Sequence, residues 1–168
     1  MVDVTDFRLL VRIAAACAAA LVAGAATAQG PEAAARARLA KYAGSYDTDA
    51  LLREPAVRAE LRKLLGPQLK HLVNNLNVKG SVDVIGGALS ISGNAPHQGT
   101  EEEAVVCVVP INMMLEAAIL SRGAITVFTR AEKYEYAMLC IKDWVTLANS
   151  GHVDRLKQPA NVRVAKPR

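Results

Sequence analysis

The sequence predicts an α+β domain: an antiparallel sheet of about five strands, with N-terminal helices and one C-terminal helix packed on it. Three observations predict this class. Residues 55–76 repeat leucine and valine at helical spacing, whereas residues 78–129 form short runs rich in valine, isoleucine, serine and glycine. A helical pattern returns at 131–149. The connections between the strand-like runs are too short for parallel crossovers, which favours an antiparallel meander.

The first 28 residues have the pattern of a secretory signal peptide. A start containing Arg8 and Arg12 precedes the apolar run IAAACAAALVAGAA, and Ala26 and Ala28 occupy the two small-residue positions that signal peptidase reads. We therefore expect cleavage after Ala28 and export of the mature chain. An uncleaved anchor helix is the alternative, although no charged stop-transfer flank follows the apolar run.

Helical segments come first in the mature chain. Residues 29–50 are expected to form a helical lead-in with good helix propensity but a poor apolar face. The next helix is better defined, because Pro55 suits a first helical position and Gly66 suits a C-cap. A second short amphipathic helix is predicted to follow Pro67. The α+β domain itself is expected to occupy residues 51–150.

The strands follow from residue 78. Gly86 and Gly87 separate two strand-like runs and predict a hairpin turn. The runs AVVCVV, MLEAAIL and AITVFT continue the sheet, and the segment 131–149 closes the fold as a helix. Its single tryptophan, Trp144, lies on the apolar side of this helix and is interpreted as a core residue.

The net charge of +4 is concentrated at the C-terminus. Residues 29–151 contain 13 Lys and Arg against 13 Asp and Glu, so the body of the chain is neutral. This balance gives no argument for a nucleic-acid-binding face. Residues 151–168 are basic and contain Pro159 and Pro167, and they are predicted to be a disordered tail.

Cys107 and Cys140 remain after removal of the signal peptide. In an oxidising compartment they can form one disulfide or remain as two buried thiols, and the sequence leaves both possibilities open. His71, His97 and His152 have no metal-ligand spacing, so neither a metal nor a cofactor is predicted.

No catalytic motif is present in the chain. Glu101, Glu102 and Glu103 are consecutive, and in an extended segment only Glu101 and Glu103 share a face. A glycosidase needs two carboxylates in different environments, which three adjacent exposed glutamates do not provide. We interpret Glu101 and Glu103 as an acidic rim beside a loop, and the protein as a non-enzyme.

The candidate functional feature is the loop between two predicted strands. Its residues are Asn94, Ala95, Pro96, His97, Gln98 and Gly99. Pro96 fixes its own φ, and Gly99 permits a sharp bend. The Asn94 side chain is expected to bond the backbone N–H of His97 or Gln98. This pattern predicts a tight loop with His97 near its apex.

The loop and the order of elements resemble the family called inhibitor of vertebrate lysozyme (Ivy). The family loop reads Cys-Lys-Pro-His-Asp-Cys after a serine and a small residue. Ser92 and Gly93 take the preceding places here, and Pro96 and His97 match directly. The resemblance extends over residues 51–145, through the segments EPAVRAELRKLLG, VDVIGGALSISG, EAAILSRGAITVFT and IKDWV.

The resemblance implies a periplasmic protein of a Gram-negative bacterium that inhibits lysozyme-like muramidases by protein–protein binding. In the family the loop enters the substrate cleft, and the histidine, here His97, meets the two catalytic carboxylates. Family members pair, and an exposed sheet edge also makes a homodimer reasonable. No nucleic acid, and no stable membrane insertion after signal cleavage, is expected.

This chain departs from the family at four loop positions. Asn94 and Gly99 replace the two cysteines, so no disulfide can close the loop, and Ala95 and Gln98 replace Lys and Asp. The alternative function is therefore a same-fold envelope protein that controls the cell's own lytic transglycosylases or binds another cell-wall partner without inhibiting lysozyme.

Overall fold

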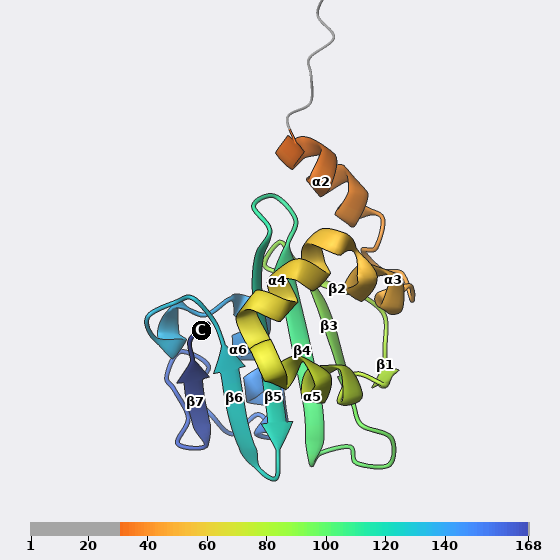
Figure 1. Ribbon diagram of the computed structural model, residues 1–168. Helices are drawn as coiled ribbons and strands as arrows, with labels where there is room; N and C mark the ends of the chain where they lie inside the picture. Colours follow the sequence, from red (N-terminus) through yellow and green to blue (C-terminus); the bar gives the residue numbers. More distant parts are fainter. Residues whose placement is uncertain (1–30, 168) are drawn as a thin grey trace, which may run out of the picture. The chain divides into compact units, whose positions relative to one another are not determined.

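The computed structural model describes residues 31–167, and the predicted signal peptide at 1–28 lies outside the described residues (Figure 1). The helices of the described part are α2 (Pro31–Ala40), α3 (Thr48–Arg53), α4 (Pro55–Leu65), α5 (Leu69–Asn74) and α6 (Leu139–Ala148), with 3-10 turns η1 (Gly66–Gln68) and η2 (Tyr134–Tyr136). None of these helices combines the length and the apolar character that crossing a membrane requires.

One seven-stranded sheet forms the centre of the fold. Its strands are β1 (Val78–Lys79), β2 (Asp83–Ile85), β3 (Ala88–Asn94), β4 (Glu102–Val109), β5 (Met114–Ser121), β6 (Ala124–Phe128) and β7 (Val162–Ala165). The order is β1-β3-β4-β5-β6-β7, and β2 also pairs with β3. The predicted antiparallel meander is confirmed from β3 to β6. The sheet has more strands than the five predicted.

The hairpin between β2 and β3 turns at the predicted glycines. Gly86 and Gly87 have φ of 58° and 79°, and Ile85 pairs with Ala88 across them. Two consecutive positive φ values are the geometry of a type I′ turn, which matches the twist of the flanking strands. Glycine adopts this conformation at no steric cost.

The sheet is buried on both faces. Residues of β4 alternate, so that Ala104, Val106 and Val108 enter one core while Val105 and Cys107 enter the other. Side chains of a strand point alternately to opposite faces, so burial on both faces explains why the run AVVCVV is continuously apolar. Helices α3, α4 and α5 cover one face, and α6 covers the other (Figure 1).

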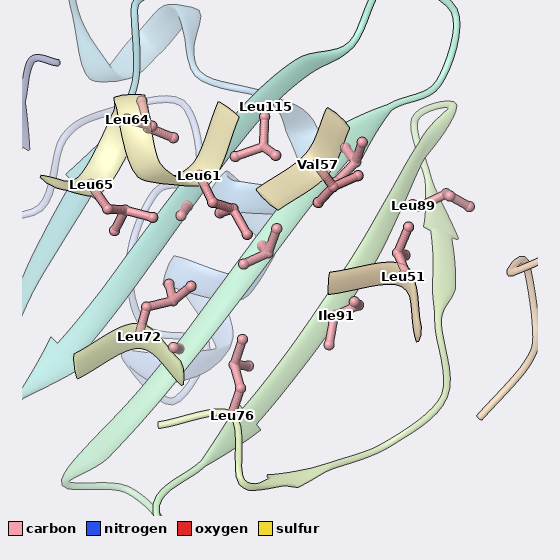
Figure 2. Close-up of a cluster of buried hydrophobic side chains, with 14 of the residues drawn as sticks. Leu51, Val57, Leu61, Leu64, Leu65, Leu72, Leu76, Leu89, Ile91 and Leu115 are labelled. Carbon is pink, nitrogen blue, oxygen red and sulfur yellow. The ribbon is translucent and has the colours of Figure 1, made fainter. Parts of the chain in front are cut away.

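The helices of the N-terminal half bury one leucine-rich stripe against β3, β4 and β5. In α4 the apolar side chains recur at helical spacing, and Figure 2 shows them pointing at the sheet beside those of α5 and β3. Each fully buried leucine contributes about 1.5–3 kcal/mol relative to an exposed one. The labelled members of this core are Leu51, Val57, Leu61, Leu64, Leu65, Leu72, Leu76, Leu89, Ile91 and Leu115.

Helix α6 is held to the opposite face by apolar packing, by a disulfide bond and by hydrogen bonds to a buried carboxylate. Trp144 is 7% exposed, which confirms its interpretation as a core residue. Cys107 in β4 and Cys140 in α6 form a disulfide bond. The buried Glu116 carboxylate accepts hydrogen bonds from the Thr129 hydroxyl and from the backbone N–H of Met138, the N-cap of α6.

The C-terminal helix is shorter than predicted. The helical pattern at 131–149 yields only α6, preceded by the 3-10 turn η2. Tyr134 of that turn is fully buried, and the Met138 N–H bonds Glu116 instead of continuing a helix backwards. Tertiary contacts therefore override the local helix propensity of this segment.

The prediction of a disordered tail at 151–168 is wrong for residues 162–165. They form β7, which pairs in parallel with β6, and Val162 is buried in the core under α6. The Gln158 amide donates to the Val162 carbonyl, and the Asn161 amide donates to the Gly123 carbonyl. The tail has few apolar residues, but Val162 and Val164 alternate correctly for a sheet edge, and a composition argument misses this alternation.

Candidate functional site

The loop between β3 and β4 begins with a tight turn that displays His97. The backbone N–H of Gln98 donates to the Ala95 carbonyl at 3.1 Å, with Pro96 and His97 between them. Pro96 has a fixed negative φ and His97 has φ of 61°, which is the pattern of a type II turn. Histidine is one of the few non-glycine residues enriched in this left-handed region. His97 is exposed, as the sequence predicts for the apex of the loop.

A second turn completes the loop and fixes its neck. The N–H groups of Glu101 and Glu102 donate to the Gln98 carbonyl at 3.2 and 2.9 Å, and Thr100 has φ of 71°. At the neck, the Ala95 N–H donates to the Glu102 carbonyl at 2.9 Å. Backbone hydrogen bonds thus hold this loop together although it has no cystine.

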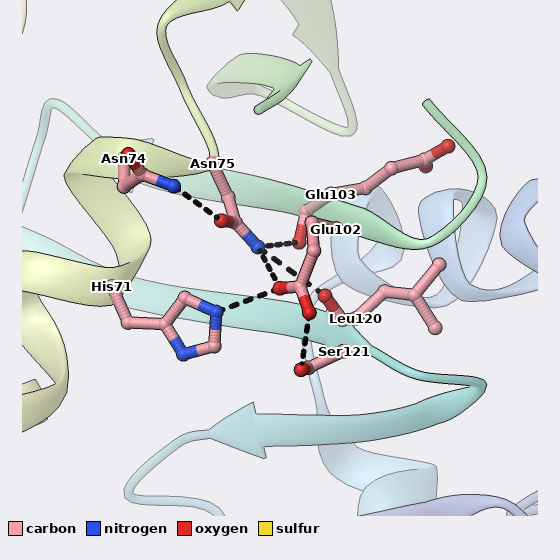
Figure 3. Close-up of polar contacts among 7 residues, drawn as sticks. All are labelled: His71, Asn74, Asn75, Glu102, Glu103, Leu120 and Ser121. Atoms are coloured by element: carbon pink, nitrogen blue, oxygen red, sulfur yellow. Dashed lines mark hydrogen bonds and ion pairs between the residues drawn. The ribbon is translucent and has the colours of Figure 1, made fainter. Parts of the chain in front are cut away.

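Glu102 anchors the loop to the body of the domain (Figure 3). One carboxylate oxygen accepts the Ser121 hydroxyl at 2.6 Å, and the other accepts His71 Nε2 at 2.8 Å and the Asn75 amide at 3.1 Å. Asn75 is fully buried, and its amide also lies 3.3 Å from the carbonyls of Glu103 and Leu120. The residue that follows the loop is therefore tied to α5 and to the end of β5.

The hydrogen bonds to Glu102 favour its charged form. Partial burial acts to raise the pKa of this carboxyl, but the bonds from Ser121, His71 and Asn75 outweigh burial and hold the pKa below its usual value. Glu102 is thus an ionised structural anchor. Glu103 is the next residue of β4, and its carboxylate accepts the Thr100 N–H instead of joining this cluster.

Two loop residues lie differently from the predictions. The Asn94 side chain does not bond the N–H of His97 or Gln98, because the Gln98 N–H is already used by Ala95; the Asn94 amide donates to the Ala95 carbonyl at 2.7 Å instead. Ala95 was predicted as part of the target-binding loop, but it is 1% exposed and has no accessible surface to offer a target. The accessible part of the loop is 96–99.

The two glutamates of the predicted acidic rim, Glu101 and Glu103, differ in exposure and in hydrogen bonding. Glu101 is exposed, and its carbonyl accepts the N–H of Arg122 from the β5–β6 turn at 3.0 Å. Glu103 is half-buried, and its carboxylate accepts the Thr100 N–H at 2.8 Å. Of the two, Glu101 has the more accessible carboxylate.

Positions 94 and 99 face each other across the neck of the loop. A Cβ atom placed on Gly99 would lie 3.8 Å from the Asn94 amide nitrogen and 4.0 Å from its Cγ. These are the two places at which the Ivy loop carries cysteines. In this chain the two positions lie close together without a covalent bond.

The disulfide Cys107–Cys140 serves another part of the fold. Cys107 lies on the α6 face of β4, with a Cα–Cα distance of 6.4 Å to Cys140. It fastens α6 to the sheet and does not close the loop at 94–99. The described residues contain no group of three His, Cys, Asp or Glu side chains that could hold a metal ion.

The anchor of the loop was not among the sites predicted from the sequence. Glu102 carries no signal that separates it from its two glutamate neighbours, and Ser121 is far away in the chain. His71 and Asn75 are four residues apart, so they share one helix face, and this spacing is the only available hint.

Comparison with known proteins identifies the family. A family model described as inhibitor of vertebrate lysozyme (Ivy) matches residues 56–149, more than half of the chain. No individual curated protein and no solved structure matches it. The matched range runs from α4 through the loop to the end of α6 and agrees with the resemblance found in the sequence. The chain therefore belongs to the Ivy family of lysozyme inhibitors.

Proposed function

We propose that this protein inhibits lysozyme-like muramidases by inserting the loop 96–99 into the substrate cleft, with His97 at the catalytic carboxylates. The observation that carries the proposal is the exposed imidazole at the left-handed position of a hydrogen-bonded turn. Membership of a family of lysozyme inhibitors supplies the class of partner. On this proposal the protein is a binding protein and not an enzyme.

The chemistry of a glycosidase cleft suits an imidazole. The cleft holds two carboxyl groups, one protonated and one ionised. An imidazole N–H can donate to a carboxylate oxygen, and a protonated imidazole can donate to two. Such a bond to a charged group contributes about 1.5–3 kcal/mol net.

The rest of the affinity must come from the shape of the loop. A loop that already has its bound conformation loses little entropy on docking. Here the Gln98 and Ala95 backbone bonds and the Glu102 anchor hold that conformation. They take the place of the cystine that closes the loop in the family.

We place this activity in the periplasm, where a cleaved signal peptide would deliver the mature chain. Wall-degrading muramidases act in that compartment, and its oxidising conditions permit the bond between Cys107 and Cys140. A mature N-terminus at Gln29, measured on protein recovered from the periplasm, is the expected outcome.

A lysis assay tests the inhibition. Purified mature protein is added to wall suspensions with a panel of lysozymes and lytic transglycosylases. His97→Asn is the informative variant, because asparagine tolerates the left-handed turn but lacks the imidazole. We expect it to weaken inhibition roughly ten- to hundredfold, the equivalent of one hydrogen bond to a charged group.

His152→Asn is the matched control, since His152 is an exposed histidine outside the loop. It should inhibit like the native protein. Inhibition that survives His97→Asn unchanged contradicts the insertion of His97. Inhibition confined to transglycosylases would identify the cell's own enzymes as targets, and release of soluble wall fragments without any added muramidase would show that the protein is itself an enzyme.

A further inference from the structure

A basic groove lies on the face of the sheet that α4 and α5 cover. It has a volume of about 790 Å³ and runs between the C-terminal end of α4 with η1 and the strands β5, β6 and β7. Figure 1 shows β6 and β7 at the edge of the sheet next to these helices. The floor is made by Ile119, Thr126, Phe128 and Ala165 of the sheet.

The charged side chains that line the groove are all cationic. They are Arg62, Lys63, Arg163 and Lys166, and no Asp or Glu is among the lining residues. All four are exposed. Of these four side chains, only Lys63 has a carboxylate partner within residues 31–167. That partner is Glu60 at 2.7 Å, which also pairs with Arg130.

The C-terminal segment supplies half of this charge. Arg163 belongs to β7 and donates through Nε to the Thr126 hydroxyl at 2.7 Å, and Lys166 follows the strand and donates to the Ala131 carbonyl. Docking of β7 therefore brings these cations to the same groove as Arg62 and Lys63 of α4. A chain body with balanced charge acquires a cationic surface in this way.

The groove adjoins two of the residues that anchor the neck of the loop. His71 and Ser121 line the groove, and both bond the Glu102 carboxylate at the loop neck. The Arg122 N–H reaches the Glu101 carbonyl from the same side. A molecule that receives the loop in its cleft would bring the rim of that cleft towards His71 and Ser121, which border the groove.

We propose that the groove binds an acidic rim beside the cleft of the target, so that the muramidase recognised by this protein carries a negatively charged surface there. This inference rests on the proposed function and specifies its partner. Complementary charge across an interface accelerates encounter and rejects partners of like charge. A strongly basic lysozyme would place its own cations against those of the groove.

A graded set of probes tests the charge requirement. One basic c-type lysozyme is used native, with its lysines acetylated, and with its lysines succinylated, so that the surface passes from positive through less positive to negative. Association and dissociation rates with the mature protein are measured at low and at high salt. We expect the association rate constant to rise along this series at low salt and the differences to shrink at high salt.

The matched variants separate the groove from the loop. Arg62→Glu with Arg163→Glu should slow association with the succinylated enzyme about tenfold at low salt and abolish the preference over the native enzyme. Lys70→Glu with Lys133→Glu is the control, since both lysines are exposed and outside the groove. This control should slow association with the succinylated enzyme clearly less than the groove variant does.

The outcomes distinguish the two proposals. Binding that is equally fast for all three forms of the enzyme, or that ignores the groove substitutions, overturns the acidic-rim inference while a loss with His97→Asn still supports the loop. Binding that depends on the groove but not on His97 overturns the proposed function. A circular dichroism spectrum of each variant excludes misfolding as the cause.

Discussion

An engineered disulfide across the loop neck tests whether hydrogen bonds stand in for the family's cystine. The change is Asn94→Cys with Gly99→Cys. The two positions face each other, with a Gly99 Cβ 4.0 Å from Asn94 Cγ, the atom whose place a cysteine sulfur would take. Gly99 does not have a left-handed φ, so a cysteine fits its backbone conformation.

The magnitude follows from the length of the closed segment. The chain-entropy expression gives about 2 kcal/mol for closing six residues. The Asn94 amide bond to the Ala95 carbonyl is lost, at a cost of about 1 kcal/mol. We therefore expect the free energy of unfolding to rise by about 1 kcal/mol. Because the free loop then samples fewer conformations, affinity for a muramidase should improve by at most about thirtyfold.

The assay combines peptide mapping, denaturant unfolding and inhibition, each with and without reductant. Asn94→Ser with Gly99→Ser is the control, since it removes the same amide and the same glycine without a crosslink. Oxidised protein in which positions 94 and 99 remain unpaired would show that the neck is not closed as described. A crosslink that forms but weakens inhibition would refute the claim that the free loop already has its bound shape.

Three further predictions concern the body of the domain. Replacing Cys107 and Cys140 together by alanine should lower the free energy of unfolding by about 3.7 kcal/mol, from a separation of 33 residues, and calorimetry that shows no loss would contradict the bond. The buried Tyr134 hydroxyl has no partner within residues 31–167 and burial raises its pKa to about 12, so Tyr134→Phe should stabilise the fold by about 1 kcal/mol or more in urea unfolding. Burial raises the pKa of Glu116 above its usual value, although the hydrogen bonds from Thr129 and Met138 oppose this effect. The protonated carboxyl therefore stabilises the folded state fully below pH 4.5, and this stabilisation is lost as the pH rises through the raised pKa. As the pH rises from 4 to 7, the free energy of unfolding of Glu116→Gln should increase relative to that of the native protein. A difference that stays constant with pH would contradict this prediction.

The sequence predicts most helices and strands of this domain because the local residue patterns favour the same elements that the fold contains. The leucine spacing at 55–65 specifies α4, the glycine pair at 86–87 specifies a hairpin, and the apolar run AVVCVV specifies the strand β4. The exposed turn at His97 also follows from local chemistry, because Pro96 restricts its own φ and histidine tolerates the next position. These features depend on residues close together in the chain.

The sequence by itself determined the fold class, the family and the histidine of the loop, since periodicity, turn residues and a short motif are local properties. Only the tertiary structure decided what holds and surrounds that loop. Glu102 meets His71, Asn75 and Ser121, and Arg163 joins Arg62 in one groove, because the sheet order brings distant segments together. Such pairings depend on long-range register, which the chain's local preferences do not specify.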